Sequence, residues 1–360
     1  MVKKNMKSKK IIRVLLLGFV LSSLVLTACS GSGLLAGSSW PAVNADDAGH
    51  VFLAYKTELY AVDSSNGSLL WTYPEKSDMG QLFYSQPGIL DDNVIAGTYN
   101  NRVHAINKDR GSLSWSFTDA KGKFIAGILV DQNQIFAPSV DHSLYALDSN
   151  GNQLWSFETK NALWAKPAAD EDTIYLPSMD HSLYAVDRQN GTQVWVTELD
   201  GASIFSPVLV EDVLFVGTID GSFYALNAKT GNILWSTKVD AALWSTPVVQ
   251  NGKVFMGDLD GNVYAFDAET GSQIWKIVLN GSIISGAVSF SDGVVFPTEN
   301  GDLVAVDESG NKLWTRSVTG KIMGTPIVID DTLVFGVLDG DALMYAFDFK
   351  GNQIWDFKLK

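Results

Sequence analysis

The side chains best suited to hold a metal ion are four histidines and a single cysteine, Cys29. His142 and His181 each follow an Asp at the same point of two consecutive repeats, where other repeats carry Asp-Gly or Asn-Gly. Such pairs indicate hairpin turns in which both central residues take positive φ, a conformation that His tolerates better than most residues. We therefore interpret both histidines as turn residues. His50 and His104 have no ligand spacing to either, so we predict no metal site.

Acidic residues that would serve acid–base or calcium chemistry fall at a repeated position. An Asp that can hydrogen-bond the backbone of a tight turn is the third residue of six copies of one motif: Asp63, Asp148, Asp187, Asp267, Asp307 and Asp348. The stretch LDGDALMYAFD, Leu338–Asp348, looks like a calcium loop only if that repeat is ignored. No Ser/His/Asp set or glycine-rich phosphate loop stands out. We predict no catalytic residue and no cofactor.

The motif itself is typified by ALNAKTGNILW, Ala225–Trp235. It occurs eight times and ends each time in a tryptophan: Trp71, Trp115, Trp155, Trp195, Trp235, Trp275, Trp314 and Trp355. Successive tryptophans are 44, 40, 40, 40, 40, 39 and 41 residues apart. A fixed period near 40 indicates a stacked or circular repeat architecture.

Each repeat divides into four short segments rich in β-branched and aromatic residues, with turn residues between them. In the sixth repeat these segments begin at Leu243, Lys253, Asn262 and Ser272. The turn signals between second and third segments include Asp220-Gly221, Asp260-Gly261, Asn300-Gly301 and Asp339-Gly340. Four strands per repeat make one blade of a β-propeller. The sequence therefore predicts an all-β, eight-bladed propeller with four antiparallel strands per blade.

The repeated motif closely resembles the tryptophan-docking motif of the PQQ-like (quinoprotein-type) propeller family, over about residues 39–360. In that family each tryptophan lies between the Ala of its own motif and a glycine peptide of the neighbouring blade, and its N–H bonds a backbone carbonyl there. The resemblance implies that the eight motif tryptophans fasten the blades. The last motif is followed only by residues up to Lys360, so we expect contiguous blades and closure without strand exchange.

The N-terminus has the form of a secretory signal. Six basic residues and no acidic ones fall within residues 1–28, and an uncharged apolar run, Val14–Leu26, leads to Leu26-Thr27-Ala28-Cys29. This end resembles the lipobox of bacterial lipoproteins, which implies cleavage before Cys29. Cys29 would then be the mature N-terminus and carry a thioether-linked diacylglycerol with palmitate-type chains. We expect a signal peptide at 1–28, a lipidated tether at 29–38 and the propeller at 39–360. The alternative is an uncut signal anchor.

The resemblance also implies a location. Ser30 follows the cysteine where an Asp would signal inner-membrane retention in enterobacteria, which favours the periplasmic face of an outer membrane. In a bacterium with one membrane we expect the outer face of the cytoplasmic membrane. The formal net charge of −14 argues against nucleic-acid binding, and a single cysteine excludes an intramolecular disulfide. We expect a monomeric propeller with a protein partner in the envelope.

Three functions follow from the resemblance. The match in size, blade number and lipid anchor is best to scaffold lipoproteins of the outer-membrane β-barrel assembly machinery, which are not catalytic. A cell-surface carbohydrate- or ligand-binding lipoprotein is the second. A PQQ-dependent dehydrogenase is the third, but those enzymes are larger and commonly carry an adjacent-cysteine disulfide and a calcium site, whereas this chain has no cysteine after Cys29.

A candidate binding face is predicted from the first segment of each repeat. Six of these segments contain a Pro at the same position, and the other two have Gly127 and Gly286 there. Residues three positions earlier form a predicted ring near one mouth of the central channel: Ser38, Tyr84, Phe124, Trp164, Ile204, Trp244, Ile283 and Met323. Tyr84, Phe124, Trp164 and Trp244 make this ring aromatic, as a peptide-, strand- or sugar-binding surface requires. Lys166, the one charged residue in the adjacent register, is predicted to point into the channel. The alternative is that the ring only caps the core between blades.

One insert interrupts the even spacing. The irregular stretch YPEKSDMGQLFYSQP, Tyr73–Pro87, accounts for the 44-residue gap between the first two tryptophans. Extra length in one loop of an even array often marks a binding face, so this loop is a further candidate.

Overall fold

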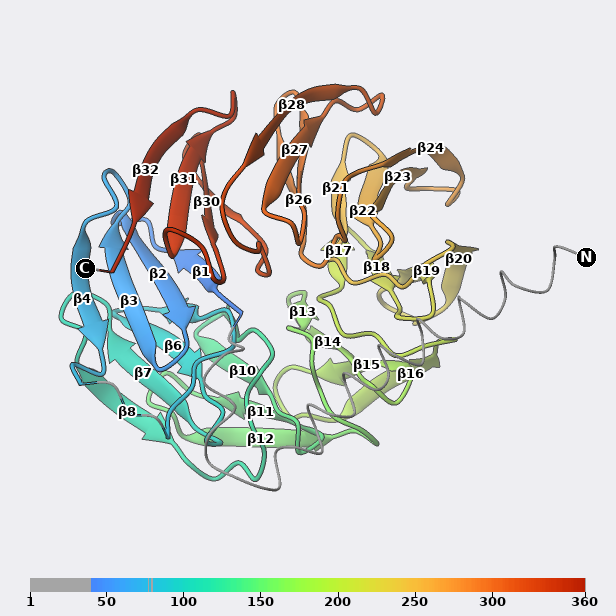
Figure 1. Ribbon diagram of the computed structural model, residues 1–360. Helices are drawn as coiled ribbons and strands as arrows, with labels where there is room; N and C mark the ends of the chain where they lie inside the picture. Colours follow the sequence, from blue (N-terminus) through green and yellow to red (C-terminus); the bar gives the residue numbers. More distant parts are fainter. Residues whose placement is uncertain (1–39, 77, 79, 360) are drawn as a thin grey trace, which may run out of the picture. The chain divides into compact units, whose positions relative to one another are not determined.

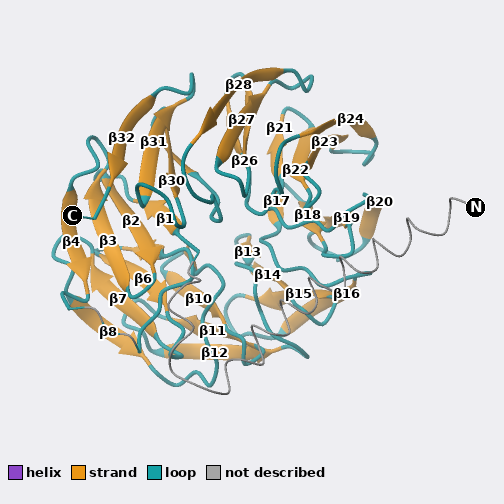
Figure 2. Ribbon diagram, viewed as in Figure 1, coloured by secondary structure: helices purple, strands orange, loops and turns teal. Residues whose placement is uncertain are grey.

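The computed structural model describes residues 40–76, 78 and 80–359, which belong to one compact unit (Figure 1). The regular structure of these residues consists of 32 strands in eight four-stranded antiparallel sheets, with no helix among them (Figure 2). The sheets stand as blades around a common centre, which confirms the predicted eight-bladed propeller. Across the described ranges, no helical segment has the length and apolarity needed to cross a membrane.

The first four blades are formed by consecutive strands. Blade 1 contains β1 (Ala42–Ala45), β2 (His50–Tyr55), β3 (Glu58–Asp63) and β4 (Leu69–Tyr73). Blade 2 contains β5 (Gly88–Leu90), β6 (Asn93–Gly97), β7 (Val103–Asn107) and β8 (Leu113–Phe117). Blade 3 contains β9 (Leu129–Asp131), β10 (Gln134–Pro138), β11 (Ser143–Leu147) and β12 (Gln153–Glu158). Blade 4 contains β13 (Ala168–Ala169), β14 (Thr173–Pro177), β15 (Ser182–Asp187) and β16 (Gln193–Glu198).

The last four blades repeat this order. Blade 5 contains β17 (Val208–Val210), β18 (Val213–Gly217), β19 (Ser222–Asn227) and β20 (Ile233–Lys238). Blade 6 contains β21 (Val248–Gln250), β22 (Lys253–Gly257), β23 (Asn262–Asp267) and β24 (Gln273–Val278). Blade 7 contains β25 (Val288–Phe290), β26 (Gly293–Pro297), β27 (Asp302–Val306) and β28 (Lys312–Ser317). Blade 8 contains β29 (Ile327–Ile329), β30 (Thr332–Gly336), β31 (Met344–Asp348) and β32 (Gln353–Phe357).

The second strand of each blade is apolar on both faces because each blade is packed between two others. In β2, Val51 and Leu53 join the core shared with blade 8, whereas Phe52 and Ala54 join the core shared with blade 2. The side chains of a strand point alternately to its two sides, so a continuous apolar run fills both interfaces. Eight such cores occur in the described residues, one for each pair of adjacent blades.

The hairpins between second and third strands differ from the prediction in one respect. Only one residue of each predicted pair has positive φ: Gly221, Gly261 and Gly301, but Asp339 rather than Gly340. The loop between β18 and β19 holds four residues, and Gly221 donates its N–H to the carbonyl of Thr218. A four-residue loop is commonly built on a type I turn, which needs fewer positive φ angles than a two-residue hairpin.

The ring closes without exchange of a strand, as expected. All four strands of blade 1 come from the start of the described chain and all four of blade 8 from its end, and these blades lie side by side in Figure 1. Pro41 packs so closely on blade 8 that a Cβ placed on Gly336 would lie 2.6 Å from the Cβ of Pro41. The predicted signal peptide, Cys29 and the tether lie outside the described residues.

Candidate functional site

The motif tryptophans share one geometry at all eight blade interfaces. Each pairs with the Ala of its own motif across the third and fourth strands, as Ala225 does with Trp235, beside a β-bulge. Each indole N–H donates to a backbone carbonyl of the next blade's motif at 2.7–3.0 Å, the acceptors in order being Lys108, Ser149, Arg188, Ala228, Ala268, Glu308, Phe349 and Ser64. These tryptophans therefore fasten each blade to the next around the whole ring.

The motif glycines provide the space for these rings. A Cβ placed on Gly231 would lie 2.6 Å from Cε3 of Trp195, and the φ of Gly231 is +72°. Blade 8 is an exception, because its Gly351 faces the Arg316 side chain instead of a tryptophan. Arg316 Nε donates to the Gly351 carbonyl at 2.7 Å, so an arginine reinforces this interface.

The register of the first strands requires a correction to the predicted ring. The residue directly before each first strand, which we call the entry position, is Pro in six blades but Ile128 in blade 3 and Ala287 in blade 7. Gly127 and Gly286 stand one residue earlier and were wrongly aligned with the prolines. The slip arises because Gly replaces a different, neighbouring residue in these two repeats.

Phe124 is therefore not a binding-face residue. It is fully buried in the core between blades 2 and 3, and its ring lies 6.1 Å from that of Tyr145. A shift of one residue along an extended chain reverses the side-chain direction, which places Phe124 and likewise Ile283 in the core. In these two blades Phe124 and Ile283 have the capping role that was the alternative interpretation.

The corrected mouth ring is formed by the residues three positions before the entry positions: Tyr84, Ile125, Trp164, Ile204, Trp244, Ile284 and Met323. Tyr84, Trp164 and Trp244 are partly exposed. The structure does not join these three aromatic rings into one cluster. The ring of Tyr84 lies tilted against that of Tyr99 at 5.1 Å, whereas Trp244 contacts Trp40 at 6.4 Å and Phe205 at 6.3 Å. Trp164 makes no ring contact within the described part of the chain.

Lys166 belongs to a second ring, closer to the strands. This inner ring consists of the residues that directly precede the entry positions: Trp40, Gln86, Gly127, Lys166, Ser206, Thr246, Gly286 and Thr325. The Lys166 side chain passes over Gly127 of blade 3 to reach Gln86 of blade 2, where Nζ donates to Oε1 at 3.3 Å. Burial lowers the pKa of Lys166 from its usual value.

The insert Tyr73–Pro87 covers the junction of blades 1 and 2. Phe83 is fully buried and forms backbone bridges to both Lys56 and Thr98, so the end of the insert joins the two blades. Tyr73 packs edge-on against His104 at 6.1 Å. Desolvation lowers the pKa of His104 to about 4, and Nδ1 lies 2.7 Å from Ser116 Oγ. The first residue of the insert and Phe83 near its end therefore have a packing role, whereas Glu75 and Lys76 are exposed.

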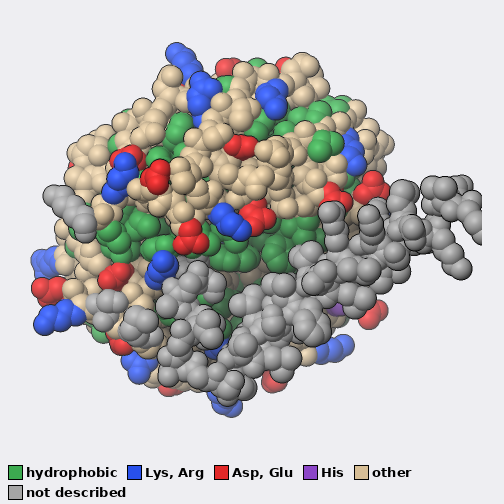
Figure 3. All heavy atoms as spheres, in the orientation of Figure 1, with side chains coloured by type: hydrophobic (Ala, Val, Ile, Leu, Met, Phe, Trp, Pro, Cys, Tyr) green, Lys and Arg blue, Asp and Glu red, His purple; other side chains and the backbone are tan. Residues whose placement is uncertain are grey.

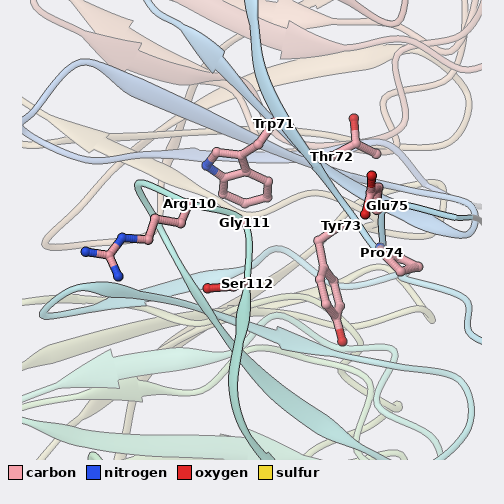
Figure 4. Close-up of a pocket in the computed structure, with 8 residues that line it drawn as sticks. All are labelled: Trp71, Thr72, Tyr73, Pro74, Glu75, Arg110, Gly111 and Ser112. Atoms are coloured by element: carbon pink, nitrogen blue, oxygen red, sulfur yellow. The ribbon is translucent and has the colours of Figure 1, made fainter.

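An open depression of about 510 Å³ lies where the insert begins (Figure 4). It is lined by Trp71, Thr72, Tyr73, Pro74, Glu75, Arg110, Gly111 and Ser112. Figure 4 shows the Trp71 indole beside the backbone of Gly111, so the floor of the depression is a docking contact already used by the fold. No reactive pair of side chains is brought together there.

The two turn histidines take left-handed conformations, with φ +75° at His142 and +65° at His181. The two histidines thus have the positive φ that the turn interpretation predicts, whereas Asp141 and Asp180 before them do not. Within the described ranges, no three His, Cys, Asp or Glu side chains gather as metal ligands. In the space-filling view hydrophobic side chains form a band across the middle of the face, with acidic and basic side chains beside it (Figure 3).

Sequence reasoning missed Gln86, Phe205 and Tyr99, which contact the predicted residues Lys166, Trp244 and Tyr84. The signal for Gln86 was present, since Gln86 and Lys166 stand directly before prolines of the same repeat position. No signal indicated that Trp40 of blade 1 and Trp244 of blade 6 meet.

Comparisons with known proteins agree with this architecture. A family described as outer membrane protein assembly factor BamB matches the chain over residues 31–126, 55–204, 179–284 and 259–360. No curated protein sequence matches the chain. BamB from Moraxella catarrhalis superimposes with a TM-score of 0.73 at 18% identity, covering 85% of this chain and 96% of that one. The computationally designed protein Ika8 has a TM-score of 0.72 at 15% identity, covering 88% and 98%. At these identities, the similarity of this chain to the two solved structures shows a common fold and no common function.

Proposed function

The chain belongs to the family of outer membrane protein assembly factor BamB, and from this we propose that it is a non-catalytic binding scaffold of the bacterial envelope. The finer proposal is that it assists the assembly of outer-membrane proteins by holding a protein partner. The family match carries this proposal, because it spans the whole repeat array. The geometry is compatible with this proposal, because the repeated motif residues have a structural role in joining the blades.

The binding face that we propose is the corrected mouth ring. Tyr84, Trp164 and Trp244 are partly exposed there, and none of them belongs to the repeated motif whose tryptophans fasten the blades. Large aromatic side chains dominate the energetics of protein interfaces, because they bury much apolar area at a small cost in conformational entropy. Phe124 is excluded from this face by its burial.

Capture from solubilised membranes tests this proposal. The purified protein is expected to retain components of the outer-membrane barrel-assembly machinery, and a Trp164→Ala/Trp244→Ala variant is expected to lose them. The matched control is Leu154→Ala/Leu313→Ala, which truncates two exposed apolar residues on outer strands. If the Trp164→Ala/Trp244→Ala variant captures as much partner as the control variant does, the mouth ring is not the binding face. Retention of a polysaccharide in place of proteins would favour a carbohydrate-binding lipoprotein instead.

We further propose that Cys29 carries a lipid anchor and that residues 29–38 tether the propeller to the membrane. Radiolabelled palmitate is expected to be incorporated into the wild-type chain and not into Cys29→Ser, since Cys29 is the only cysteine. Partition of wild-type protein into the aqueous phase of a detergent extract would contradict the anchor. Catalysis is tested separately: with PQQ and calcium added, clear dye-linked oxidation of glucose or an alcohol would overturn the scaffold assignment.

A further inference from the structure

Lys166 is the one charged side chain of the inner ring. Its only hydrogen bond among the described residues joins Nζ to Gln86 Oε1 at 3.3 Å, and no carboxylate of those residues pairs with it. An ammonium group that is largely surrounded by protein costs free energy unless it is paired. The Lys166 residue as a whole is nevertheless partly exposed at the inner ring.

The neighbouring residues hold this amine in place. A Cβ placed on Gly127 would lie 3.1 Å from Cβ and 3.2 Å from Cδ of Lys166, so the absence of a side chain at Gly127 makes room for the lysine stem. Gln86 is oriented in turn, because its Nε2 donates to the carbonyl of Val43 in blade 1 at 3.0 Å. Residues of four blades thus position one ammonium group that has donors to spare.

We propose that Lys166 is an anion-binding residue whose ammonium group binds the carboxylate of a ligand with an apolar body. One monovalent cation suits a monovalent anion, and the rest of the inner ring is uncharged. A phosphate would require further cations, and the acidic chain as a whole disfavours polyanions.

The apolar part of the ligand has a surface of its own. Trp40 belongs to the same inner ring as Lys166, and its indole packs against Trp244, which in turn contacts Phe205. Seven of the eight inner-ring residues are partly exposed, Gly286 being the buried one. A cation and partly exposed aromatic groups at one end of the propeller are the features that recognise an apolar carboxylic acid or the C-terminal carboxylate of an apolar peptide.

Isothermal titration of the purified propeller tests the proposal with benzoate, N-acetyl-leucine and the peptide Ala-Ala-Ala-Leu as free acids. The C-terminal amides of the two leucine compounds and inorganic phosphate are the comparison probes. Wild-type protein is expected to bind the acids and not the amides or phosphate. No binding of any acid at about 10 mM, or a preference for phosphate, overturns the proposal.

The decisive variant is Lys166→Met, which keeps the length of the stem and removes the charge. Its affinity for the acids is expected to fall by about tenfold or more. Lys160→Met, at an exposed position of the connection leading into blade 4, is the matched control and should bind like wild type. Gly127→Ala, which crowds the lysine stem, should also weaken binding. If Lys166→Met does not fold, Lys166→Gln replaces it, and undiminished binding by the uncharged variant refutes the assignment.

The relative affinities separate the two sources of the carboxylate. Tighter binding of Ala-Ala-Ala-Leu than of benzoate indicates a peptide terminus, and the reverse order indicates a small organic acid. The titration uses purified protein without membranes, so its failure leaves the scaffold proposal intact. Loss of partner capture would equally leave the carboxylate site intact.

Discussion

The indole nitrogen of Trp355 donates a hydrogen bond to the backbone carbonyl of Ser64 at 2.7 Å, across 291 residues of chain. Trp355 ends the last motif and Ser64 lies within the first, so this bond closes the ring. Its geometry is that of the seven other docking contacts, and the Cβ of a residue replacing Gly67 would collide with the same indole at 2.6 Å. Closure is therefore an ordinary blade interface formed between the two ends of the chain.

Truncation of the closing tryptophan is expected to destabilise the whole propeller. Trp355→Ala removes a nearly buried ring and leaves the Ser64 carbonyl without its donor, which should cost about 3–5 kcal/mol in urea unfolding. Trp195→Ala, at an internal interface, is expected to cost a similar amount, whereas Leu154→Ala on an exposed strand should cost less than about 0.5 kcal/mol. A Trp355→Ala variant as stable as wild type would show that closure does not depend on this contact.

Two glycines with nearly the same φ allow the effect of backbone strain to be measured apart from that of a steric clash. Gly252 has φ +70° and open space around an added Cβ, whereas Gly231 has φ +72° and the Trp195 ring at 2.6 Å. Gly252→Ala should cost about 1 kcal/mol through backbone strain alone. Gly231→Ala should cost about 2 kcal/mol more, because the indole must move. Equal melting temperatures of the two variants would show that the missing side chain at Gly231 is not what makes room for the Trp195 ring.

The ion pair between Asp131 and Arg188 joins blades 3 and 4 and is asymmetric in exposure. The Arg188 side chain is 4% exposed and that of Asp131 is 40% exposed. Asp131→Asn leaves a buried cation without its counter-charge and is expected to cost about 3 kcal/mol. Arg188→Met leaves a carboxylate that water can solvate but also removes the donors to the carbonyls of Asp131 and Asp170, so its cost should be about 2 kcal/mol. Chemical denaturation of both variants checks this order, and the reverse order would mean that the pair is hydrated.

Acid is expected to destabilise the junction of blades 1 and 2 through His104. Burial lowers the pKa of His104 to about 4, against 6.5 for an unperturbed histidine. Between these values the unfolded chain binds more protons than the native protein, so the stabilisation is complete above pH 6.5 and is lost as the pH falls through 4. The difference corresponds to about 3 kcal/mol. Between pH 7 and pH 4, the free energy of unfolding of His104→Gln should fall by about 3 kcal/mol less than that of wild type. Equal falls in the two proteins would show that His104 is not the group responsible.

The blade count and the docking tryptophans were accessible from the sequence because each repeat is a local unit. The spacing of Ala225, Gly231 and Trp235 within eleven residues depends on one turn and one β-bulge, and it returns wherever that local geometry returns. The fold of every blade was therefore predicted, as was closure without strand exchange. The turn type was not, because Asp-Gly pairs occur in both two-residue and four-residue loops.

The mouth ring was predicted only in part. Trp164 and Trp244 are partly exposed as expected, but Phe124 was placed there by aligning Gly127 with the prolines. Pattern alone cannot distinguish Gly in place of Pro from Gly in place of its neighbour, and an error of one residue exchanges a core side chain for a mouth side chain. The strand pairing distinguishes the two alignments. Leu129 pairs with Phe136 just as Val208 pairs with Phe215, so Ile128, and not Gly127, is equivalent to Pro207.

Everything that repeats can be derived from the sequence alone: four strands per unit, eight units and a docked tryptophan at each interface. The three-dimensional arrangement of the blades is needed to show which unlike residues meet across the ring. Lys166 reaches Gln86 over 80 residues because Gly127 between them has no side chain, and Trp40 of blade 1 meets Trp244 of blade 6. Repetition encodes contacts between neighbouring blades, whereas contacts across the ring depend on how eight blades close, which no single repeat contains.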